Sequence, residues 1–533
     1  MNRAEVEAWI ADDPDPKTAE QLQQLLDQNN EDELAKLFSG FLTFGTAGLR
    51  GPVAPGPSGM NRAVVGRTAA AIAKYMKDRN LNSVVIGRDA RYGSEDFTRE
   101  SAEILSGAGL QVSVLPRPLP TPVLAFAVKR LGADVGIMVT ASHNPPMDNG
   151  YKVYLNADVD GINYQGSQII TPTDKLISAE IDKITSLKSQ PRGSKWVELD
   201  DAILNDYVAR TALIGKTPGN LKIVYTAMHG VGTETIEAVF KKANYQPLIL
   251  VSEQCTPDPD FPTVAFPNPE EPGAIDLSLA KAKEVGADLV IANDPDADRC
   301  AAAINDPVHG WRMLRGDELG ILLGDWIART NDGNYGNSIV SSSGLSKIAK
   351  YYGRNFQETL TGFKYLAQIP NMAFAYEEAI GYCVDSNSVS DKDGISAAMA
   401  LAQLATELAA NGQTIYDRLQ EIWKIIGYHA TEQISIRVEN IKLVAAVLDR
   451  IRNAPPQEIA GIKVTQIDDL AKPSGNLPPT DGLRIWLGYI RVIIRPSGTE
   501  AKMKCYIEVI STTEAEANQV LAKIRGPLKE MLR

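Results

Sequence analysis

Three segments of the chain share one order of features, in which a short apolar stretch runs directly into a polar loop. Residues 132–139 lead into Thr-Ala-Ser-His-Asn-Pro-Pro at 140–146, and residues 286–292 lead through Asn293 into Asp-Pro-Asp-Ala-Asp-Arg at 294–299. Residues 372–375 lead in the same way into Tyr-Glu-Glu-Ala-Ile-Gly-Tyr at 376–382. Apolar runs of this length are typical of buried strands, and open α/β sheets bind ligands at the carboxyl ends of their strands. The repeat therefore predicts three related α/β domains, each presenting one loop for chemistry.

The last hundred residues follow a different order. Strands are predicted at 433–438, 461–465, 483–494 and 502–509, with helices at 441–452 and 513–531, which together indicate an α+β domain. A chain of 533 residues is also too long for one hydrophobic core. We predict an α/β protein with three similar mixed α/β domains and a C-terminal α+β domain. The predicted boundaries are 1–200, with a helical N-terminal extension near 17–37, then 201–315, 316–430 and 431–533.

Composition limits the classes of partner. The formal net charge of −12 opposes non-specific binding to nucleic acid or to an anionic membrane surface. The four cysteines form no CxxC pair, which argues against a zinc site and favours a reducing compartment. The acidic first 16 residues show no apolar segment typical of a secretory signal, and no apolar run approaches the roughly 20 residues of a membrane helix. We expect a cytoplasmic protein whose ligands are small molecules; the sequence does not indicate an oligomeric state.

The loop at 294–298 predicts a metal site. Asp294, Asp296 and Asp298 alternate, so that in an extended or looped backbone all three carboxylates can point to one side. Their mutual repulsion calls for a cation, and hard oxygen ligands favour Mg²⁺ or Ca²⁺. An EF-hand does not fit, because Arg299 stands where that motif needs glycine and Asn305 where it needs glutamate. An acidic, solvated turn is the alternative interpretation.

A second loop has the composition of a phosphate site. Arg-Pro-Ser-Gly-Thr-Glu at 495–500 follows the predicted strand and combines a guanidinium, two hydroxyls and a glycine amide. Lys502 and Lys504 add positive charge nearby. An ordinary surface turn is the alternative. The sequence has no GxxxxGK[ST] loop and no GxGxxG motif after a strand, so it gives no sign of nucleotide binding.

Three further loops are informative only in combination. Phe-Gly-Thr-Ala-Gly-Leu-Arg-Gly at 44–51 is a glycine-rich turn with an arginine, and Thr-Gly-Phe-Lys at 361–364 is of the same kind. Glu377 and Glu378 end an apolar strand, where carboxylates can accept hydrogen bonds from sugar hydroxyls. In the loop at 140–146, Ser142 is placed for chemistry at a strand end, although the same residues are also typical of a turn.

Taken together and in this order, these motifs resemble those of the α-D-phosphohexomutases, the phosphoglucomutase/phosphomannomutase superfamily, across nearly the whole chain. The branch that contains phosphopentomutases and glucose-1,6-bisphosphate synthases is the most similar in its sugar loop. The resemblance implies four domains around a central cleft, carrying in turn a phosphoserine loop, a metal loop, a sugar-binding loop and a phosphate-binding loop.

The resemblance also implies roles for individual residues. Ser142 would be the phosphorylated nucleophile, with Lys152 and Arg50 as the other catalytic residues and Lys152 as a candidate proton shuttle. Mg²⁺ would be held by Ser142, in its phosphorylated form, together with Asp294, Asp296 and Asp298. The implied substrate contacts are Thr46, His143, Arg299, Thr361, Gly362, Lys364, Glu377, Lys392, Arg495, Ser497, Gly498, Thr499 and Lys504.

The function implied is that of a phosphosugar mutase, an intramolecular phosphotransferase. Phosphoglucomutase is the leading hypothesis, with phospho-Ser142 and glucose 1,6-bisphosphate as carriers of the phosphoryl group. Ala379 stands where hexose-selective relatives often have serine. Phosphopentomutase, phosphomannomutase and glucose-1,6-bisphosphate synthase therefore remain alternative activities for the same site. Outside these activities, the alternatives are a Mg²⁺-dependent phosphatase with Asp294 as nucleophile, phosphorylation of His143 instead of Ser142, and a non-catalytic sugar-phosphate sensor.

Overall fold

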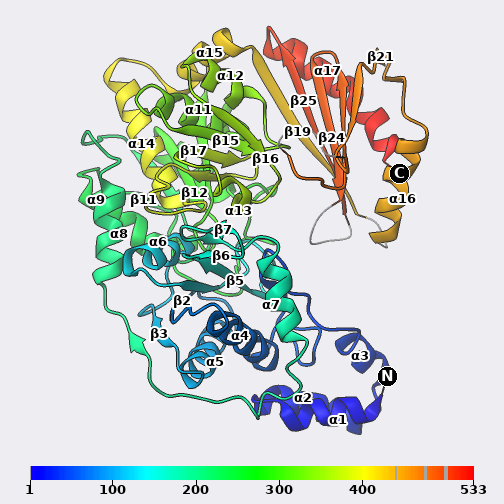
Figure 1. Ribbon diagram of the computed structural model, residues 1–533. Coiled ribbons are helices and arrows are strands. Elements are labelled where there is room, and N and C mark those ends of the chain that lie inside the picture. The colour runs from blue at the N-terminus through cyan, green and yellow to red at the C-terminus, as the bar shows by residue number, and fades with distance from the viewer. Residues whose placement is uncertain (1, 438–440, 473–476, 497–501, 533) are drawn as a thin grey trace. The chain divides into compact units, whose positions relative to one another are not determined.

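The computed structural model describes residues 2–437, 441–472, 477–496 and 502–532 (Figure 1). The chain divides into two compact units, Met1–Met313 with Gly381–Glu407 and Leu314–Ile380 with Leu408–Arg533. Four larger β-sheets follow one another along the sequence, the first two in unit 1. The observed architecture is three β-sheets covered by helices, followed by an antiparallel β-sheet with helices. This confirms the predicted fold class.

The first sheet has the strand order β1-β5-β4-β2-β3-β9, with β8 beside β5. Strands β2, β3 and β4 are parallel, and β5 turns back antiparallel to β4. Every residue of β4 is buried, because α4 and α5 cover one face of the sheet and α6 the other (Figure 1). The elements are β1 Leu49–Pro52, α4 Arg62–Lys77, β2 Ser83–Arg88, α5 Ser94–Gly107, β3 Gln111–Val114, α6 Thr121–Leu131, β4 Val135–Val139, β5 Asp148–Leu155, β6 Asp158–Val159, β7 Ile162–Asn163, β8 Ser167–Gln168, α7 Thr173–Ile181 and β9 Val197–Glu198.

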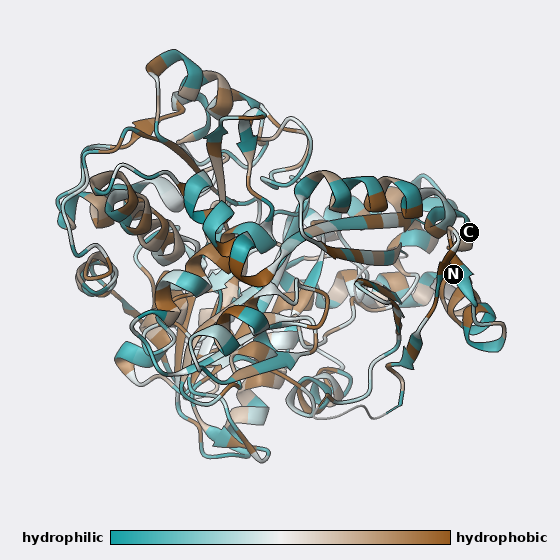
Figure 2. Cartoon of the chain, turned by 90° about the horizontal axis from the view of Figure 1, so that it is seen from above, coloured by the Kyte–Doolittle hydropathy of each residue, from teal (hydrophilic) through white to brown (hydrophobic). Residues whose placement is uncertain are grey.

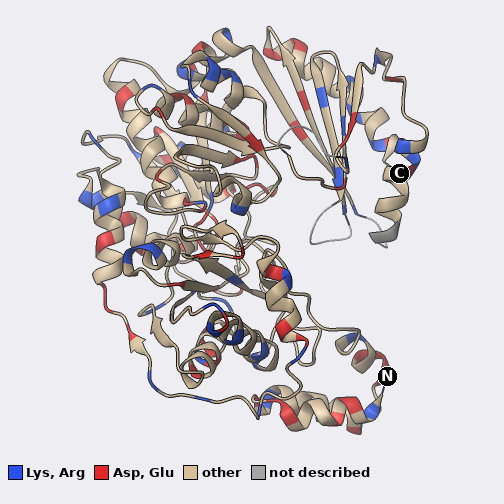
Figure 3. Ribbon diagram, in the orientation of Figure 1, with Lys and Arg blue, Asp and Glu red and all other residues tan. Residues whose placement is uncertain are grey.

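Three helices precede this sheet: α1 Arg3–Asp12, α2 Pro16–Asp27 and α3 Glu31–Leu37. Acidic and basic residues both occur along them (Figure 3). Helix α1 is anchored to α4, because Arg67 pairs with Asp12 at 3.3 Å and its guanidinium lies 4.7 Å from the ring centre of Trp9. The sequence predicted helices only over 17–37 and missed α1, whose buried residues are Val6 and Trp9 alone, too few to produce a helical period.

The second sheet, also in unit 1, has the order β11-β10-β12-β13-β14. Strand β12 is buried throughout and parallel to β10, and β13 returns antiparallel beside it. The acidic loop of residues 294–298 thus starts at the carboxyl end of β12. The elements are α8 Ala202–Ala212, β10 Ile223–Thr226, α9 Gly232–Lys242, β11 Ile249–Leu250, α10 Asp276–Val285, β12 Leu289–Asn293, β13 Cys300–Asp306 and β14 Gly310–Met313; β18 Gly381–Cys383 and most of α14 Gly394–Ala410 belong to the same unit.

The first sheet of unit 2 contains the parallel strands β16, β15 and β17, in that spatial order. Helix α11 packs on β17 and on α12. Strand β17 ends at Glu377, so the polar loop, which the repeat predicted to begin at Tyr376, begins two residues later. The elements are α11 Gly316–Ala328, β15 Asn334–Ser338, α12 Gly344–Tyr351, β16 Phe356–Thr359, α13 Phe363–Leu366, β17 Met372–Glu377 and α15 Ile415–Ile426.

The last sheet is antiparallel with the order β19-β25-β24-β23-β22. Because side chains alternate along a strand, Val492 and Ile494 point to the face covered by α16 and α17, whereas Arg491, Ile493 and Arg495 share the other face. The predicted strand at 483–494 is in fact a hairpin of β23 and β24 that turns at Gly488, whose φ of 66° suits glycine. The elements are β19 Tyr428–Arg437, α16 Ile441–Asn453, β20 Glu458–Ile459, β21 Ile462–Lys463, β22 Gln466–Asp469, β23 Leu483–Leu487, β24 Ile490–Pro496, β25 Lys502–Ser511 and α17 Glu514–Met531.

Hydrophobic and hydrophilic residues alternate along the helices (Figure 2), as expected where one side of a helix covers a sheet. Among the helices of the described residues, none combines the length and the apolar character needed to cross a membrane.

Candidate active site

Ser142 lies in a tight turn directly after β4. The Ser142 amide donates to Thr140 Oγ1 at 2.9 Å, and the Asn144 amide donates to the Ala141 carbonyl at 3.1 Å. Ser142 has a φ of 52°, a left-handed conformation that serine rarely adopts and that the surrounding contacts must maintain. The side chain is only 2% exposed, so the turn holds the hydroxyl at one place in a protected site.

The Ser142 hydroxyl meets the acidic loop that follows β12. Ser142 Oγ donates to Asp294 Oδ2 at 2.5 Å. Asp294, Asp296 and Asp298 are buried, and one oxygen from each lies within 4.8 Å of those of the other two. The structure therefore brings together the serine and the acidic residues that the sequence singled out, although 152 residues separate Ser142 from Asp294.

Three cationic side chains surround these carboxylates. Lys152 Nζ, from β5, donates to Asp296 Oδ2 at 2.7 Å and to Asp298 Oδ2 at 2.8 Å. Lys392 Nζ lies 3.3 Å from Asp298 Oδ2, and Arg299 Nε lies 3.7 Å from Asp298 Oδ1. Burial disfavours the charged form of Lys152, but the two carboxylates outweigh it and hold the lysine pKa above its usual value. Lys152 is thus a protonated, charge-balancing group in this arrangement.

The acidic residues still have unused oxygen atoms. Asp296 Oδ1 and Asp298 Oδ1 are buried and have no hydrogen-bond partner among the residues described. Burial and the neighbouring Asp296 and Asp298 raise the pKa of Asp294 well above its usual range, which reflects repulsion that a cation would relieve. Buried carboxylate oxygens that accept no hydrogen bond, grouped within reach of one ion, fit a divalent cation that prefers oxygen ligands.

Arg50 and His143 line the same loop. Arg50 Nη1 donates to Asn144 Oδ1 at 3.2 Å, and His143 Nδ1 lies 3.2 Å from Ser142 Oγ. Burial, together with Arg299 and Arg50, lowers the pKa of His143 well below its usual value, so the imidazole is neutral. Thr46 lies in the turn that precedes β1. This turn approaches β5 so closely at Gly48 that a Cβ there would lie 1.7 Å from the Tyr151 carbonyl oxygen.

Arg91 holds the Ser142 turn from behind and was missed by the sequence analysis. Its guanidinium donates to the carbonyl oxygens of Ser142, Asn144, Pro145 and Asp148 at 2.6, 2.7, 2.8 and 3.1 Å. Asp89 pairs with Arg91 at 3.4 Å, and both residues are buried. The Arg-Asp-Ala-Arg run at 88–91, which starts at the last residue of β2, was the available signal, because a strand end is where such a residue can reach a neighbouring loop.

Thr121 is a second residue that the sequence analysis missed. Its hydroxyl donates to Asp296 Oδ2 at 2.7 Å and its amide donates to the Asp296 carbonyl at 2.9 Å. Thr121 is the first residue of α6, so the amino end of that helix faces the acidic loop, where its dipole favours negative charge.

Unit 2 contains the predicted sugar loop. Glu377 ends β17, and its Oε1 accepts a hydrogen bond from the Gly362 amide at 2.7 Å. Thr361 and Lys364 flank that glycine, so the structure brings the loop at 361–364 to Glu377. Glu378 points elsewhere: its Oε2 accepts hydrogen bonds from Ser341 Oγ at 2.9 Å and Ser338 Oγ at 3.1 Å.

The predicted phosphate loop lies only partly within the described residues. Arg495 is on β24 and pairs in register with Lys504 on β25. Ser497, Gly498 and Thr499 lie outside the residues that the structure describes.

Family models match the chain in four consecutive stretches. They are described as phosphoglucomutase/phosphomannomutase alpha/beta/alpha domain I at residues 42–188, domain II at 203–309 and domain III at 315–426, and as the C-terminal domain at 434–526. The chain belongs to the phosphoglucomutase/phosphomannomutase family. The predicted resemblance is confirmed, and the chain is an enzyme of the phosphomutase class.

Relatives across the family cover most of the chain. A probable phosphomannomutase of Haemophilus influenzae is 44% identical and covers 89% of this chain and 98% of its own length. A phosphopentomutase of Mus musculus is 34% identical over 95% and 90%, and a phosphoglucomutase of Staphylococcus haemolyticus is 34% identical over 89% and 91%. The structure of a putative phosphomannomutase from Thermus thermophilus has the same fold, with a TM-score of 0.71 at 22% identity, over 92% of this chain and 99% of the other.

We predict that Arg91→Lys lowers phosphomutase activity far more than it lowers stability. A lysine ammonium cannot reach the carbonyls that the planar guanidinium spans, and misplacing a reacting group by about 1 Å can cost about a hundredfold in rate. Turnover and melting temperature are to be measured side by side. Arg79→Lys is the matched control, because Arg79 is a half-buried arginine of the same sheet layer whose partner is Asp160, at 2.7 Å. Equal losses of activity in the two variants would contradict the assignment.

We also predict that Glu378→Gln stabilises the protein at alkaline pH. Burial, with Glu377 and Asp317 nearby, raises the pKa of Glu378 to about 7 from its usual 4.5. The folded state therefore binds more protons than the unfolded state between these values, and Glu378 lowers stability as the pH rises through that range. Glutamine keeps an acceptor for the two serines without the charge. The gain in melting temperature from Glu378→Gln should be larger at pH 8 than at pH 5. The surface substitution Glu530→Gln should change the melting temperature by the same amount at both pH values.

Proposed function

We propose that the protein is a phosphosugar mutase that interconverts glucose 1-phosphate and glucose 6-phosphate through phospho-Ser142. The observation that carries this proposal is the buried hydrogen bond of 2.5 Å between Ser142 Oγ and Asp294 Oδ2, in a site that also holds Asp296, Asp298 and Lys152. A hydroxyl fixed among grouped carboxylates and cations suits a phosphoryl carrier, because phosphoryl transfer requires mainly positioning and charge stabilisation.

In the proposed first step, a free hydroxyl of the sugar phosphate attacks the phosphorus of phospho-Ser142. A new phosphorus–oxygen bond forms on the sugar, the bond to Ser142 Oγ breaks, and the proton of the sugar hydroxyl leaves while Ser142 Oγ gains one. Lys152, Lys392 and Arg299 supply positive charge at the reacting oxygens. Arg50 contacts the Ser142 turn through its hydrogen bond to Asn144. The pKa of Lys152 lies above its usual value, which supports a role as a permanent cation at the reacting oxygens.

The acidic residues and the phosphorylated serine are proposed to hold Mg²⁺. The buried Oδ1 atoms of Asp296 and Asp298, which have no hydrogen-bond partner among the described residues, support this assignment. Bound there, Mg²⁺ would neutralise the phosphoryl oxygens as charge moves between serine and sugar.

The proposed intermediate, glucose 1,6-bisphosphate, then presents its other phosphate to Ser142. The recognition residues must therefore accept the sugar in both orientations. Glu377 is proposed to bind sugar hydroxyls, with Thr46, His143 and the loop at 361–364 as further contacts. Arg495, Ser497, Gly498, Thr499 and Lys504 are proposed to bind the phosphate that does not react. The same bisphosphate would phosphorylate Ser142 in a resting enzyme.

Phosphopentomutase activity is the second candidate. Ala379 provides no hydroxyl in the sugar loop, and the relative from Mus musculus, which matches 95% of the chain, is named a phosphopentomutase. Because a relative 44% identical to this chain is named a probable phosphomannomutase, mannose phosphates belong in the same test. Initial rates with the 1-phosphates of glucose, mannose and ribose, each with Mg²⁺ and a catalytic amount of glucose 1,6-bisphosphate, rank these candidates. We further propose a cytoplasmic location, supported by four cysteines that are all free thiols.

Ser142→Ala is predicted to abolish mutase turnover while leaving the fold intact, because it removes the phosphoryl carrier and leaves the neighbouring charges unchanged. Intact mass measurement after incubation with glucose 1,6-bisphosphate should show one added phosphoryl group on the wild-type protein and none on the variant. Ser106→Ala is the control, since Ser106 Oγ donates to carbonyls of its own helix. Unimpaired turnover by Ser142→Ala would refute the mechanism, and release of inorganic phosphate as the main product would favour a phosphatase.

Mg²⁺ is predicted to raise the melting temperature of the wild-type protein and not that of Asp298→Asn. The ion would bind and stabilise only the folded state, and an asparagine gives up one of the charges that bind it. Asp306→Asn is the control, because Asp306 is a buried aspartate of the same sheet whose partner is Arg312 at 2.7 Å. Equal Mg²⁺ shifts in wild type and Asp298→Asn would contradict the metal assignment.

A further inference from the structure

The last residue of β15 and the loop that leads to α12 contain four serines in six residues, Ser-Ile-Val-Ser-Ser-Ser at 338–343, here called the serine loop. None of the predicted site residues lies in it. Its side chains are almost entirely buried at Ser338, Ser341 and Ser342. A buried polar loop must satisfy its hydrogen bonds within the protein, so its partners reveal what it is built to hold.

One side of the serine loop holds the sugar-loop carboxylate Glu378. Ser341 Oγ and Ser338 Oγ donate to Glu378 Oε2 at 2.9 and 3.1 Å, and the Glu378 amide donates back to Ser341 Oγ at 3.0 Å. Both the side chain and the backbone of Glu378 are thereby fixed, next to Glu377.

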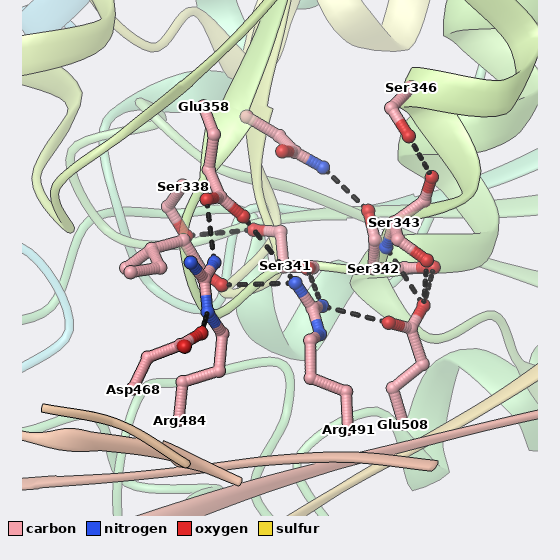
Figure 4. Close-up of polar contacts among 12 residues, drawn as sticks. Ser338, Ser341, Ser342, Ser343, Ser346, Glu358, Asp468, Arg484, Arg491 and Glu508 are labelled. Carbon is pink, nitrogen blue, oxygen red and sulfur yellow. Dashed lines mark hydrogen bonds and ion pairs between the residues drawn. The ribbon is translucent and has the colours of Figure 1, made fainter. Parts of the chain in front are cut away.

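The other side of the loop is held by the C-terminal sheet. Arg491, on β24, donates to the carbonyls of Ile339, at 3.3 Å, and Ser341. Glu508, on β25, accepts from Ser342 Oγ at 2.6 Å and from the Ser343 amide at 2.8 Å, and its Oε2 pairs with Arg491 at 2.9 Å. Figure 4 shows Arg491 and Glu508 rising side by side from the sheet toward the serine loop.

Burial makes these contacts specific. Arg491 and Glu508 are 5% and 3% exposed, and His429 Nδ1 lies 2.8 Å from Glu508 Oε1. Burial opposes ionisation of Glu508, but Arg491 and His429 outweigh it and hold its pKa below the usual range. A buried charged pair gives little net stability compared with apolar packing. It does fix one geometry, because any shift of the loop would leave a buried charge without its partner.

The same face of the sheet continues to the predicted phosphate residues. Arg491 pairs in register with Glu508, Ile493 with Tyr506, and Arg495 with Lys504. Ile493 and Tyr506 pack on Ile339 of the serine loop. Arg495 lies four positions beyond Arg491 on β24, a distance of about 13 Å along a strand. The part of β24 that contacts the serine loop is therefore directly continuous with the part that carries Arg495.

We propose that Arg491 is a positioning residue that aligns the phosphate-binding strand ends with the sugar loop through the serine loop. This inference rests on the proposed function, since it assumes that Glu377 binds sugar hydroxyls and that Arg495 and Lys504 bind phosphate. Ser341 links the two, because its carbonyl accepts from Arg491 and its hydroxyl donates to Glu378. A ligand that contacts both elements depends on their spacing, whereas a ligand that contacts one does not.

Binding measurements with two probes separate alignment from local damage. Glucose 6-phosphate carries both a sugar and a phosphate, and inorganic phosphate carries only the second. For Arg491→Lys we expect the dissociation constant of glucose 6-phosphate to rise about tenfold or more, as is typical of truncating a buried charged partner. The dissociation constant of inorganic phosphate should stay within about twofold. In turnover assays the loss should appear in KM more than in kcat, because the described contacts of Arg491 are to the serine loop, Glu358 and Glu508.

Two matched pairs of variants complete the test. Arg484→Lys is the control for Arg491→Lys, because Arg484 lies on the neighbouring strand and binds Glu358 at 2.9 Å and Asp468 at 3.1 Å, and none of its described contacts is to the serine loop. Ser341→Ala removes the link to Glu378 while keeping the carbonyl for Arg491. It should show the same selective loss as Arg491→Lys, whereas Ser346→Ala, whose hydroxyl donates to the Ser343 carbonyl at 2.7 Å, should not.

The outcomes are distinguishable. A selective loss of glucose 6-phosphate affinity in Arg491→Lys and Ser341→Ala, with both controls near wild type, supports the proposal. Equal losses for both probes, or a loss equal to that of Arg484→Lys and tracking melting temperature, would overturn it and leave Arg491 with a structural role. If the wild-type protein binds inorganic phosphate but no sugar phosphate, the proposed function itself fails.

Discussion

The buried ion pairs between Lys152 and the two carboxylates of Asp296 and Asp298 are the interaction on which the first half of the molecule depends. At an effective dielectric constant of 20, two carboxylates 4.8 Å apart repel each other by about 3–4 kcal/mol. The acidic loop therefore cannot stay buried without cations, and these come from elements outside the second sheet: Lys152 from β5 and Lys392 from the loop after β18. The site chemistry and the joining of the first two sheets rest on the same contacts.

The sequence predicted the parts of the site that are local in the chain. Ser142 and Asp294 each follow a buried strand, and a strand end is visible as a change from apolar to polar residues. Lys152 and Lys392 were named from family resemblance alone, whereas the position of Arg299 beside the acidic loop already suggested that it offsets the loop's charge. The structure supplies the same physical reason for all three residues, which is charge balance around the carboxylates. Arg91 was missed although it follows a strand end, because the loop that it contacts begins 51 residues away. Thr121 was missed because its partner lies 175 residues away and nothing in its local pattern indicates the contact.

The C-terminal sheet shows the same limit in its fold. The apolar residues from Leu483 to Ile494 read as one strand, yet they form two, because Gly488 permits a turn that the surrounding pattern hides. The serine loop is harder still to predict, since serines after a strand are typical of exposed turns. The serine loop is buried because the sheet face that carries Arg491 and Glu508 covers it and binds its polar groups.

The two units handle charge differently, and this bears on specificity. Unit 1 groups carboxylates with cations around one hydroxyl, an arrangement that can serve phosphoryl transfer whatever the rest of the substrate is. Unit 2 fixes Glu377 and Glu378 through a glycine amide and serine hydroxyls, contacts whose spacing depends on backbone position. Relatives named for glucose, mannose and pentose phosphates match nearly the whole chain. A change of sugar therefore needs no change in the charged site of unit 1, and on physical grounds it is expected in the residues that set the position of the sugar loop.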